Sequence, residues 1–222
     1  YEDDEVATIA ISDVSGGGAT ESGSQSVSIT ITENESAPVI TMLASQASAA
    51  ENSGTEVTLT LTTSQIADEN IVVSLSASGT ISSSDYVSTS LSPSTVTISA
   101  GSTTGTVSAT ASDDSIYEGN ESSTVSISGV SGGGATESGN QSITFTIVEN
   151  EAAPVITLTT SHTTVAENSG TTVTLTATAS QAADEDITVT LASTGTAING
   201  TDYSSFGGQT ITIAANSTTG TI

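Results

Sequence analysis

The chain contains no lysine, arginine, cysteine or tryptophan among its 222 residues. Phosphate backbones are bound by cationic side chains that release counterions, so nucleic acid is excluded as a partner. An anionic membrane surface is disfavoured for the same reason. The missing cysteines exclude a disulfide framework and thiolate chemistry. No apolar run approaches the roughly 20 residues of a membrane-spanning helix, so we expect no membrane insertion.

Residues suited to catalysis are also scarce. His162 is the only histidine, and Gln46 stands at the corresponding place of an earlier repeat. Serine is abundant, but no base suited to activate a serine nucleophile accompanies it. Aromatic residues make up 3% of the chain, which leaves little to stack a sugar between paired carboxylates. The sequence therefore predicts that the protein is not an enzyme.

Carboxylates dominate what charge there is. The 25 Asp and Glu residues give a net charge of −25, and the charged fraction of 11% is entirely of one sign. Salt bridges between side chains cannot hold such a fold together, because the basic partner is missing. Bulk salt, a divalent metal or a basic partner must neutralise the acids.

The sequence repeats itself at an offset of 116 residues. The decapeptide VSGGGATESG begins at Val14 and again at Val130, and the ENSGT segment begins at Glu51 and again at Glu167. A period of this length is the size of a small domain rather than a solenoid turn. We expect a complete repeat at 37–152, the C-terminal strands of a preceding or partner-completed repeat at 1–36, and the N-terminal strands of a following, incomplete repeat at 153–222.

Apolar residues alternate with threonine and serine throughout the complete repeat. Val57, Leu59 and Leu61 show this period of two, which is typical of half-buried β-strands. Clusters of Gly, Ser, Asn and Asp separate the runs. About seven strands are expected in the repeat, and no helical period is visible. The pattern predicts an all-β fold of tandem Ig-like, seven-stranded β-sandwiches without helices.

The acids gather in four loops of the complete repeat, at 50–52, 84–86, 113–121 and 149–151. Calcium prefers six to eight oxygen ligands, largely carboxylates and backbone carbonyls. The segments VAENSGT, the Asp85-Tyr86 pair, DDSIYEGNE and the closing ENE resemble the Calx-β domain. This family includes calcium-sensing domains of sodium–calcium exchangers and tandem repeats of large bacterial surface proteins. The resemblance covers essentially the whole chain.

The resemblance implies several Ca²⁺ ions per repeat and a set of oxygen ligands. In the complete repeat these ligands are Glu51, Asp85, Asp113, Asp114, the carbonyl of Ile116, Glu118, Glu121, Glu149 and Glu151. In the following repeat they are Glu167 and Asp202, and in the preceding one Glu2, Glu5, Glu33 and Glu35. The alternative for the 113–121 loop is a solvated acidic turn.

Two further recurring features have structural interpretations. Tyr1 and Tyr117 occupy one repeat position, as do Tyr86 and Tyr203, and each is expected to fill a core with its hydroxyl in water. The SGGG turns at 15–18 and 131–134 lack the lysine and helix of a phosphate-binding loop. They are expected to be flexible hairpin tips.

The function predicted from these features is that of an extracellular, cell-surface structural protein, a stalk or filament stiffened by calcium. The alternative is an adhesin module that recognises a host, matrix or surface ligand. The expected partners are calcium and adjacent repeats or further copies of the chain, arranged head to tail. Either the chain is a piece of a longer repeat protein, or residues 1–36 of one molecule complete residues 153–222 of the next by strand donation.

Overall fold

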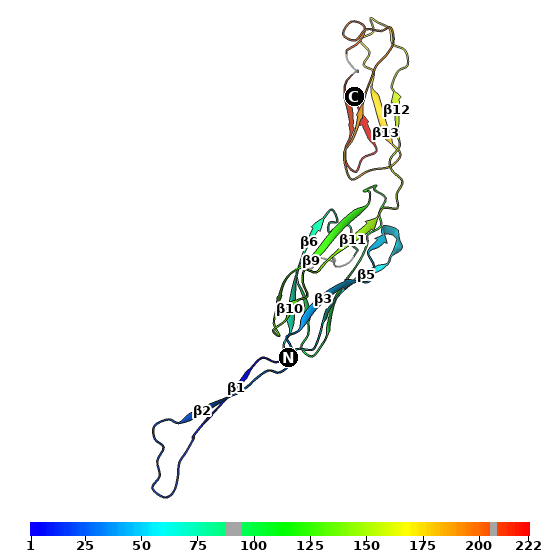
Figure 1. Ribbon diagram of the computed structural model, residues 1–222. Helices are drawn as coiled ribbons and strands as arrows, with labels where there is room; N and C mark the ends of the chain where they lie inside the picture. Colours follow the sequence, from blue (N-terminus) through cyan, green and yellow to red (C-terminus); the bar gives the residue numbers. More distant parts are fainter. Residues whose placement is uncertain (88–94, 205–207) are drawn as a thin grey trace. The chain divides into compact units, whose positions relative to one another are not determined.

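The computed structural model describes residues 1–87, 95–204 and 208–222, and it is an all-β structure (Figure 1). The prediction of an all-β fold is therefore confirmed. The described residues contain no α-helix and a single 3₁₀ turn at Glu51–Ser53. None of their helical structure is long and apolar enough to cross a membrane.

Nine strands form the central repeat as two sheets. The first sheet has the order β10-β3-β5-β8 and the second β4-β11-β9-β6-β7. The bounds are β3 Val39–Ala44, β4 Ser48–Ala50, β5 Glu56–Thr63, β6 Ile71–Gly79, β7 Thr95–Ile98, β8 Thr104–Thr110, β9 Glu121–Ser131, β10 Thr136–Glu137 and β11 Ser142–Val148. Seven of these are the expected strands. The two additional short ones, β4 and β10, pair in parallel with β11 and β3.

The alternating pattern places one face of each strand in the core. Val57, Leu59 and Leu61 of β5 are buried, whereas the threonines between them are partly accessible. Ile98 and Ile147 contribute fully buried side chains from the other sheet. Because successive residues of a strand point to opposite faces, the period of two in the sequence becomes a one-sided apolar surface on each sheet.

The N-terminal residues form a hairpin of β1 (Glu5–Ala10) and β2 (Ser26–Ile31), which pair antiparallel. Every residue of both strands is exposed. Ile29 and Ile31 are 52% and 59% exposed, while their counterparts Phe145 and Ile147 in the central repeat are 3% and 1% exposed. The hairpin therefore presents core residues that no second sheet covers.

The C-terminal residues form two small sheets, β12-β13-β16 and β14-β15. Their bounds are β12 Ile156–Thr160, β13 Leu175–Ala179, β14 Ile187–Thr190, β15 Thr210–Ile213 and β16 Thr219–Thr221. Their core is built from Ala177, Ala179, Leu191, Ile211 and Ile213. The five strands β12 to β16 are the repeat counterparts of β3, β5, β6, β7 and β8 in the central repeat.

Two compact units can be distinguished in the chain. The first comprises 1–47, 56–110 and 122–145, and the second comprises 48–55, 111–121 and 146–222. Three acidic loops of the central repeat thus belong to the second unit, together with the C-terminal sheets.

Candidate metal site

Three glutamates meet where two paired strands end. Ala50 at the end of β4 pairs with Val148 at the end of β11, and the strands run parallel. Glu51 and Glu149 directly follow these paired residues, and Glu151 lies two positions further on. Each of the three glutamates offers a carboxylate oxygen within 4.8 Å of the others. The parallel pairing of β4 with β11, which the sequence pattern did not reveal, brings the first and last acidic loops together.

Glu149 organises the neighbouring loop through backbone hydrogen bonds. Its Oε2 accepts from the backbone N–H groups of Glu118 at 2.5 Å and Gly119 at 2.8 Å. Its Oε1 accepts from the N–H of Glu151 at 2.8 Å. Burial acts to raise the pKa of Glu149, but the hydrogen bonds from Glu151, Glu118 and Gly119 outweigh it and hold that pKa below its ordinary value.

Glu51 has the opposite electrostatics. It is 4% exposed, and burial together with the negative charges of Glu149, Glu118, Glu151 and Asp114 raises its pKa to about 8. The pKa of Glu151 is also raised, first by the hydrogen bond that it shares with Glu149 and then by burial. The cluster thus brings one buried and two half-buried carboxyl groups together, and the ionised form of Glu51 is disfavoured.

A divalent cation fits these residues. Oε2 of Glu51 and Oε2 of Glu151 are buried, and neither finds a hydrogen-bond partner within the described ranges. Leaving a buried carboxylate oxygen without a partner is costly. The chain has no lysine or arginine to pair with it. Hard oxygen ligands of this kind suit calcium, which accepts carboxylates through one or two oxygens.

The remaining ligand candidates of the central repeat differ in burial and in hydrogen bonding. Glu118 and Glu121 each offer a carboxylate oxygen within 4.8 Å of the other. Asp85 is buried, and its carboxylate accepts from the backbone N–H of Ser82 and the hydroxyl of Ser84. Asp113 and Asp114 are exposed, and Asp114 accepts from the N–H of Ile116 at 2.7 Å. A ligand role for the Ile116 carbonyl stays a prediction.

We call the backbone hydrogen bonds that Glu149 accepts the loop clamp, and the preceding repeat has equivalent bonds. Glu33, the counterpart of Glu149, accepts from the N–H of Glu2 at 2.5 Å and from the N–H of Glu35 at 2.9 Å. The hydrogen bond from Glu2 is the largest cause that lowers the pKa of Glu33 to about 2. The clamp is therefore a property of the repeat rather than of one loop.

In the following repeat, Glu167 and Asp202 are exposed and line one cavity of about 630 Å³. Asp202 accepts from the N–H of Ile198 at 2.7 Å, as its counterpart Asp85 does from Ser82. These two acids are therefore brought to one cavity without forming a cluster like that of Glu51.

Sequence analysis missed Asn120. Its side-chain oxygen accepts from the N–H of Glu149 at 3.0 Å, and the carboxylate of Asp4 accepts from the N–H of Glu33 at 2.8 Å in the preceding repeat. The sequence signal that could have revealed this role is that Asp4 and Asn120 stand at the same repeat position.

Tyr1 and Tyr117 are half-buried, and the expectation that each fills a core stays a prediction. The N–H of Tyr1 donates to the carbonyl of Ile66, and the N–H of Tyr117 donates to the carbonyl of Ala182. The backbone of Tyr1 thus pairs with the loop between β5 and β6, and that of Tyr117 with the loop between β13 and β14. Periodicity in the sequence does not show which neighbour a residue contacts, so these backbone pairings could not be predicted from it.

Taken together, fold and site define an acidic, all-β repeat protein with carboxylate clusters at loop ends. Residues 55–151 match the LapA domain family, and residues 149–214 match the Calx-beta domain family. The expected resemblance to the Calx-β domain is confirmed, and the LapA match adds a second module. Both modules are non-catalytic and are typical of secreted surface proteins. No curated protein matches the chain.

Several solved structures are similar to the chain, and three of them are of Calx domains. The apo form of the Calx CBD1 domain is 13% identical, covers 52% of this chain and 99% of its own, and gives a TM-score of 0.40. CBD12 from CALX1.2 is 15% identical over 83% of this chain and 74% of its own, with a TM-score of 0.41. The calcium binding domain CBD12 of CALX1.1 is 17% identical over 82% and 73%, with a TM-score of 0.40.

Proposed function

We propose that this chain is a segment of an extracellular structural repeat protein whose acidic loops bind calcium and thereby stiffen the chain. The observation that carries the proposal is the cluster of Glu51, Glu149 and Glu151, with buried carboxylate oxygens that lack hydrogen-bond partners among the described residues. The match of 149–214 to the Calx-beta family supports calcium as the ion.

The residues of the cluster would divide the work. Glu51 and Glu151 supply the unpartnered oxygens, while Glu149 holds the 118–121 loop by its backbone hydrogen bonds. We further propose that Asp85, Asp113, Asp114 and the Ile116 carbonyl complete the ligand set with Glu118 and Glu121. Bound calcium neutralises carboxylates that otherwise repel one another.

Stiffening follows from where the cluster sits along the chain. Only Ala152 separates Glu151 from Ala153, where the next repeat is expected to begin. Fixing Glu149 and Glu151 therefore fixes the start of a very short connection. Extracellular calcium modules bind with dissociation constants on the order of 10⁻⁴–10⁻³ M, which suits a millimolar exterior.

The exposed hairpin supports a second element of the proposal, assembly by strand complementation. Ile9, Ile11, Ile29 and Ile31 are 47–59% exposed, while their counterparts in the central repeat are buried. The C-terminal sheets contain counterparts of the strands that pack against β9 and β11. The hairpin of a second copy, or of the next repeat in a longer chain, would supply what those sheets lack.

The stalk is favoured over a ligand-recognising adhesin module. The exposed apolar residues with the clearest pattern lie on β1 and β2 and are core positions of the repeat. Their exposure fits self-assembly rather than recognition of a foreign surface. Placement at the cell surface agrees with the LapA and Calx-beta matches.

Thermal unfolding with calcium or chelator tests the calcium proposal. At about 10 mM calcium, one site of the affinity given above stabilises the fold by about 1.4–2.7 kcal/mol. For a domain of this size the melting temperature rises by roughly 5–10 °C. The variant Glu51→Gln loses most of this rise because it removes a buried charged ligand. Small-angle X-ray scattering of the same samples measures the distribution of the radius of gyration, which should become narrower when calcium stiffens the chain.

Glu69→Gln is the matched control, since Glu69 is exposed and lies outside both acidic groups. It should keep the full calcium response. An equal calcium response in wild type and Glu51→Gln, or none in wild type, would refute the site.

A further inference from the structure

The triglycine turn of the central repeat is a closely packed contact rather than the free tip expected from sequence. A Cβ added to Gly132 would lie 2.1 Å from the carbonyl oxygen of Asn70. A Cβ added to Gly133 would lie 2.7 Å from the Cβ of Ala67. Such distances leave no room for any side chain, so this turn fits its surroundings only because it is glycine.

Tyr1 forms one wall of the same contact. A Cβ added to Gly134 would lie 2.4 Å from Cε1 of the Tyr1 ring. The Tyr1 backbone is fixed on both sides, donating from its N–H to the Ile66 carbonyl at 3.1 Å and accepting from the N–H of Asp68 at 3.2 Å. Tyr1, Ala67, Asn70 and Ile71 thus form a socket into which the turn fits.

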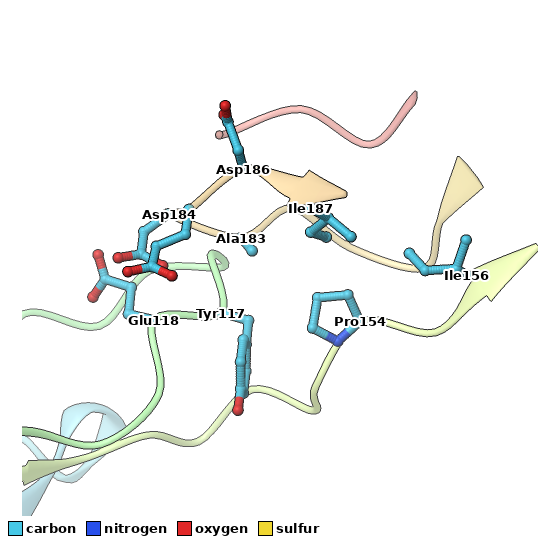
Figure 2. A pocket seen from close by; sticks show the side chains of 9 residues that line it. Tyr117, Glu118, Pro154, Ile156, Ala183, Asp184, Asp186 and Ile187 are labelled. Carbon is cyan, nitrogen blue, oxygen red and sulfur yellow. The ribbon is translucent and has the colours of Figure 1, made fainter. Parts of the chain in front are cut away.

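The C-terminal repeat contains the same socket. The N–H of Tyr117 donates to the Ala182 carbonyl at 3.0 Å, and its carbonyl accepts from the N–H of Asp184 at 3.2 Å. A pocket of about 440 Å³ lies beside it, and Figure 2 shows its lining. Four lining residues are the repeat counterparts of the socket: Tyr117, Ala183, Asp186 and Ile187. This pocket lies where the central repeat holds its triglycine turn.

A triglycine turn of the same shape stands free elsewhere in the chain. A Cβ added to Gly16, Gly17 or Gly18 would meet nothing within 4 Å. Their φ angles of 86°, 62° and 71° match the 87°, 53° and 61° of the seated turn at 132–134. The N–H of Ala19 donates to the Gly16 carbonyl at 3.2 Å, as that of Ala135 does to Gly132 at 3.1 Å. The free turn therefore already has the seated conformation, which lowers the entropic cost of docking.

We propose that the pocket between Tyr117 and Ile187 binds the Gly16–Gly18 turn of a second copy of this chain. The inference rests on the strand complementation proposed above. The docked turn would fix the register in which the partner's hairpin pairs with β14. The pairing Val72↔Ser131 in the central repeat becomes Thr188 opposite Ser15 of the partner copy. In a longer chain the corresponding turn of the next repeat would occupy the same pocket.

The first test is sedimentation equilibrium of the full chain carrying Gly17→Asn. Asparagine tolerates a left-handed backbone, so the turn is retained while a side chain is added against Ala183. We expect self-association to weaken by about 5- to 150-fold, because overpacking a closed contact costs about 1–3 kcal/mol.

Gly23→Asn is the matched control in the same hairpin. Gly23 also has a positive φ, and its counterpart Gly139 touches nothing within 4 Å in the completed repeat. Its association should stay within about twofold of wild type, because no contact is filled. Equal weakening by both variants would overturn the proposal, since the turn conformation rather than docking would then matter.

Cross-linking separates the docked turn from strand complementation itself. The chain has no cysteine, so Ser15→Cys with Thr188→Cys should yield covalent oligomers on oxidation only if these strands pair in register. Ser24→Cys with Thr188→Cys should not. Oligomers combined with an unaffected Gly17→Asn association would refute the docked turn and leave complementation standing. A wild-type chain that stays monomeric, together with a Ser15→Cys/Thr188→Cys variant that forms no covalent oligomers, would refute both, whatever the calcium response.

Discussion

At the scale of single residues, Glu51 and Glu149 show how the same side chain takes opposite roles a few ångströms apart. Glu149 accepts three backbone hydrogen bonds, which favour its charged form. Glu51 is buried beside other acids, which favours its neutral form. The carboxylate of Glu149 holds the loop by hydrogen bonds. The negative charge of ionised Glu51 is unfavourable unless a cation or a proton neutralises it.

The raised pKa of Glu51 predicts a particular dependence on pH without metal. Its folded pKa is about 8 against an ordinary 4.5, so its contribution to stability is complete below pH 4.5 and is lost as the pH rises through 8. Glu51→Gln mimics the protonated form at every pH. In chelator, the melting temperature of Glu51→Gln should therefore gain on wild type steadily from pH 5 to pH 9.

Calcium should reverse the order of the two proteins at the alkaline end, because wild type gains a ligand that the variant lacks. Melting curves at pH 5, 7 and 9, with and without calcium, check both statements. A difference between the two proteins that does not change with pH in chelator would contradict the assignment of the raised pKa to Glu51.

At the scale of elements, one strand pattern has different outcomes in different surroundings. In the central repeat β9 extends over Glu121–Ser131, whereas its counterpart β1 ends at Ala10. The residues after Ala10 have the same type of sequence but lack the partner that β6 provides to β9. A segment with strand propensity thus forms a strand only where a neighbour pairs with it, since the backbone groups of an unpaired segment hydrogen-bond to water.

The central sandwich allows a matched test of burial. Leu61 on β5 is 0% exposed and Leu43 on the adjacent β3 is 72% exposed. Leu61→Ala should lower the free energy of unfolding by about 2–5 kcal/mol, because it removes buried methyl groups and leaves a cavity. Leu43→Ala should change it by less than about 0.5 kcal/mol. Urea titration of both variants measures the difference, and similar losses would show that β3 and β5 are packed otherwise.

At the scale of the whole molecule, the charge of −25 with no basic side chain makes the ionic surroundings part of the fold. Like charges destabilise a compact state, and salt screens them over about 8 Å at physiological ionic strength. Screening acts on every carboxylate, whereas chelation acts on the clustered ones.

Melting at matched ionic strength separates screening from chelation. Raising sodium chloride from about 10 to 150 mM should increase the melting temperature, because the screening length falls from about 30 to 8 Å. Calcium chloride should add a further rise that magnesium chloride does not reproduce, since magnesium demands a stricter octahedral geometry and keeps its waters. Identical curves for the three salts would mean that screening alone stabilises the chain.

The sequence by itself determined the all-β class, the repeat offset and the chemistry of the acidic loops. Alternation of apolar residues with threonine is a local property, and a repeat is visible as identity at a distance. The prediction that nucleic acid is not a partner also needed no fold, because it rests on the missing basic residues.

The tertiary structure decided which acids meet and which residues join neighbouring repeats. Glu51 reaches Glu149 through the pairing of β4 with β11, strands almost 100 positions apart that carry no distinctive local pattern. The backbone of Tyr1 pairs with the loop between β5 and β6, and Gly132–Gly134 are packed while Gly16–Gly18 are free, although the two segments are identical. Identical sequences cannot differ by themselves, so the difference comes from the neighbours that three-dimensional packing supplies.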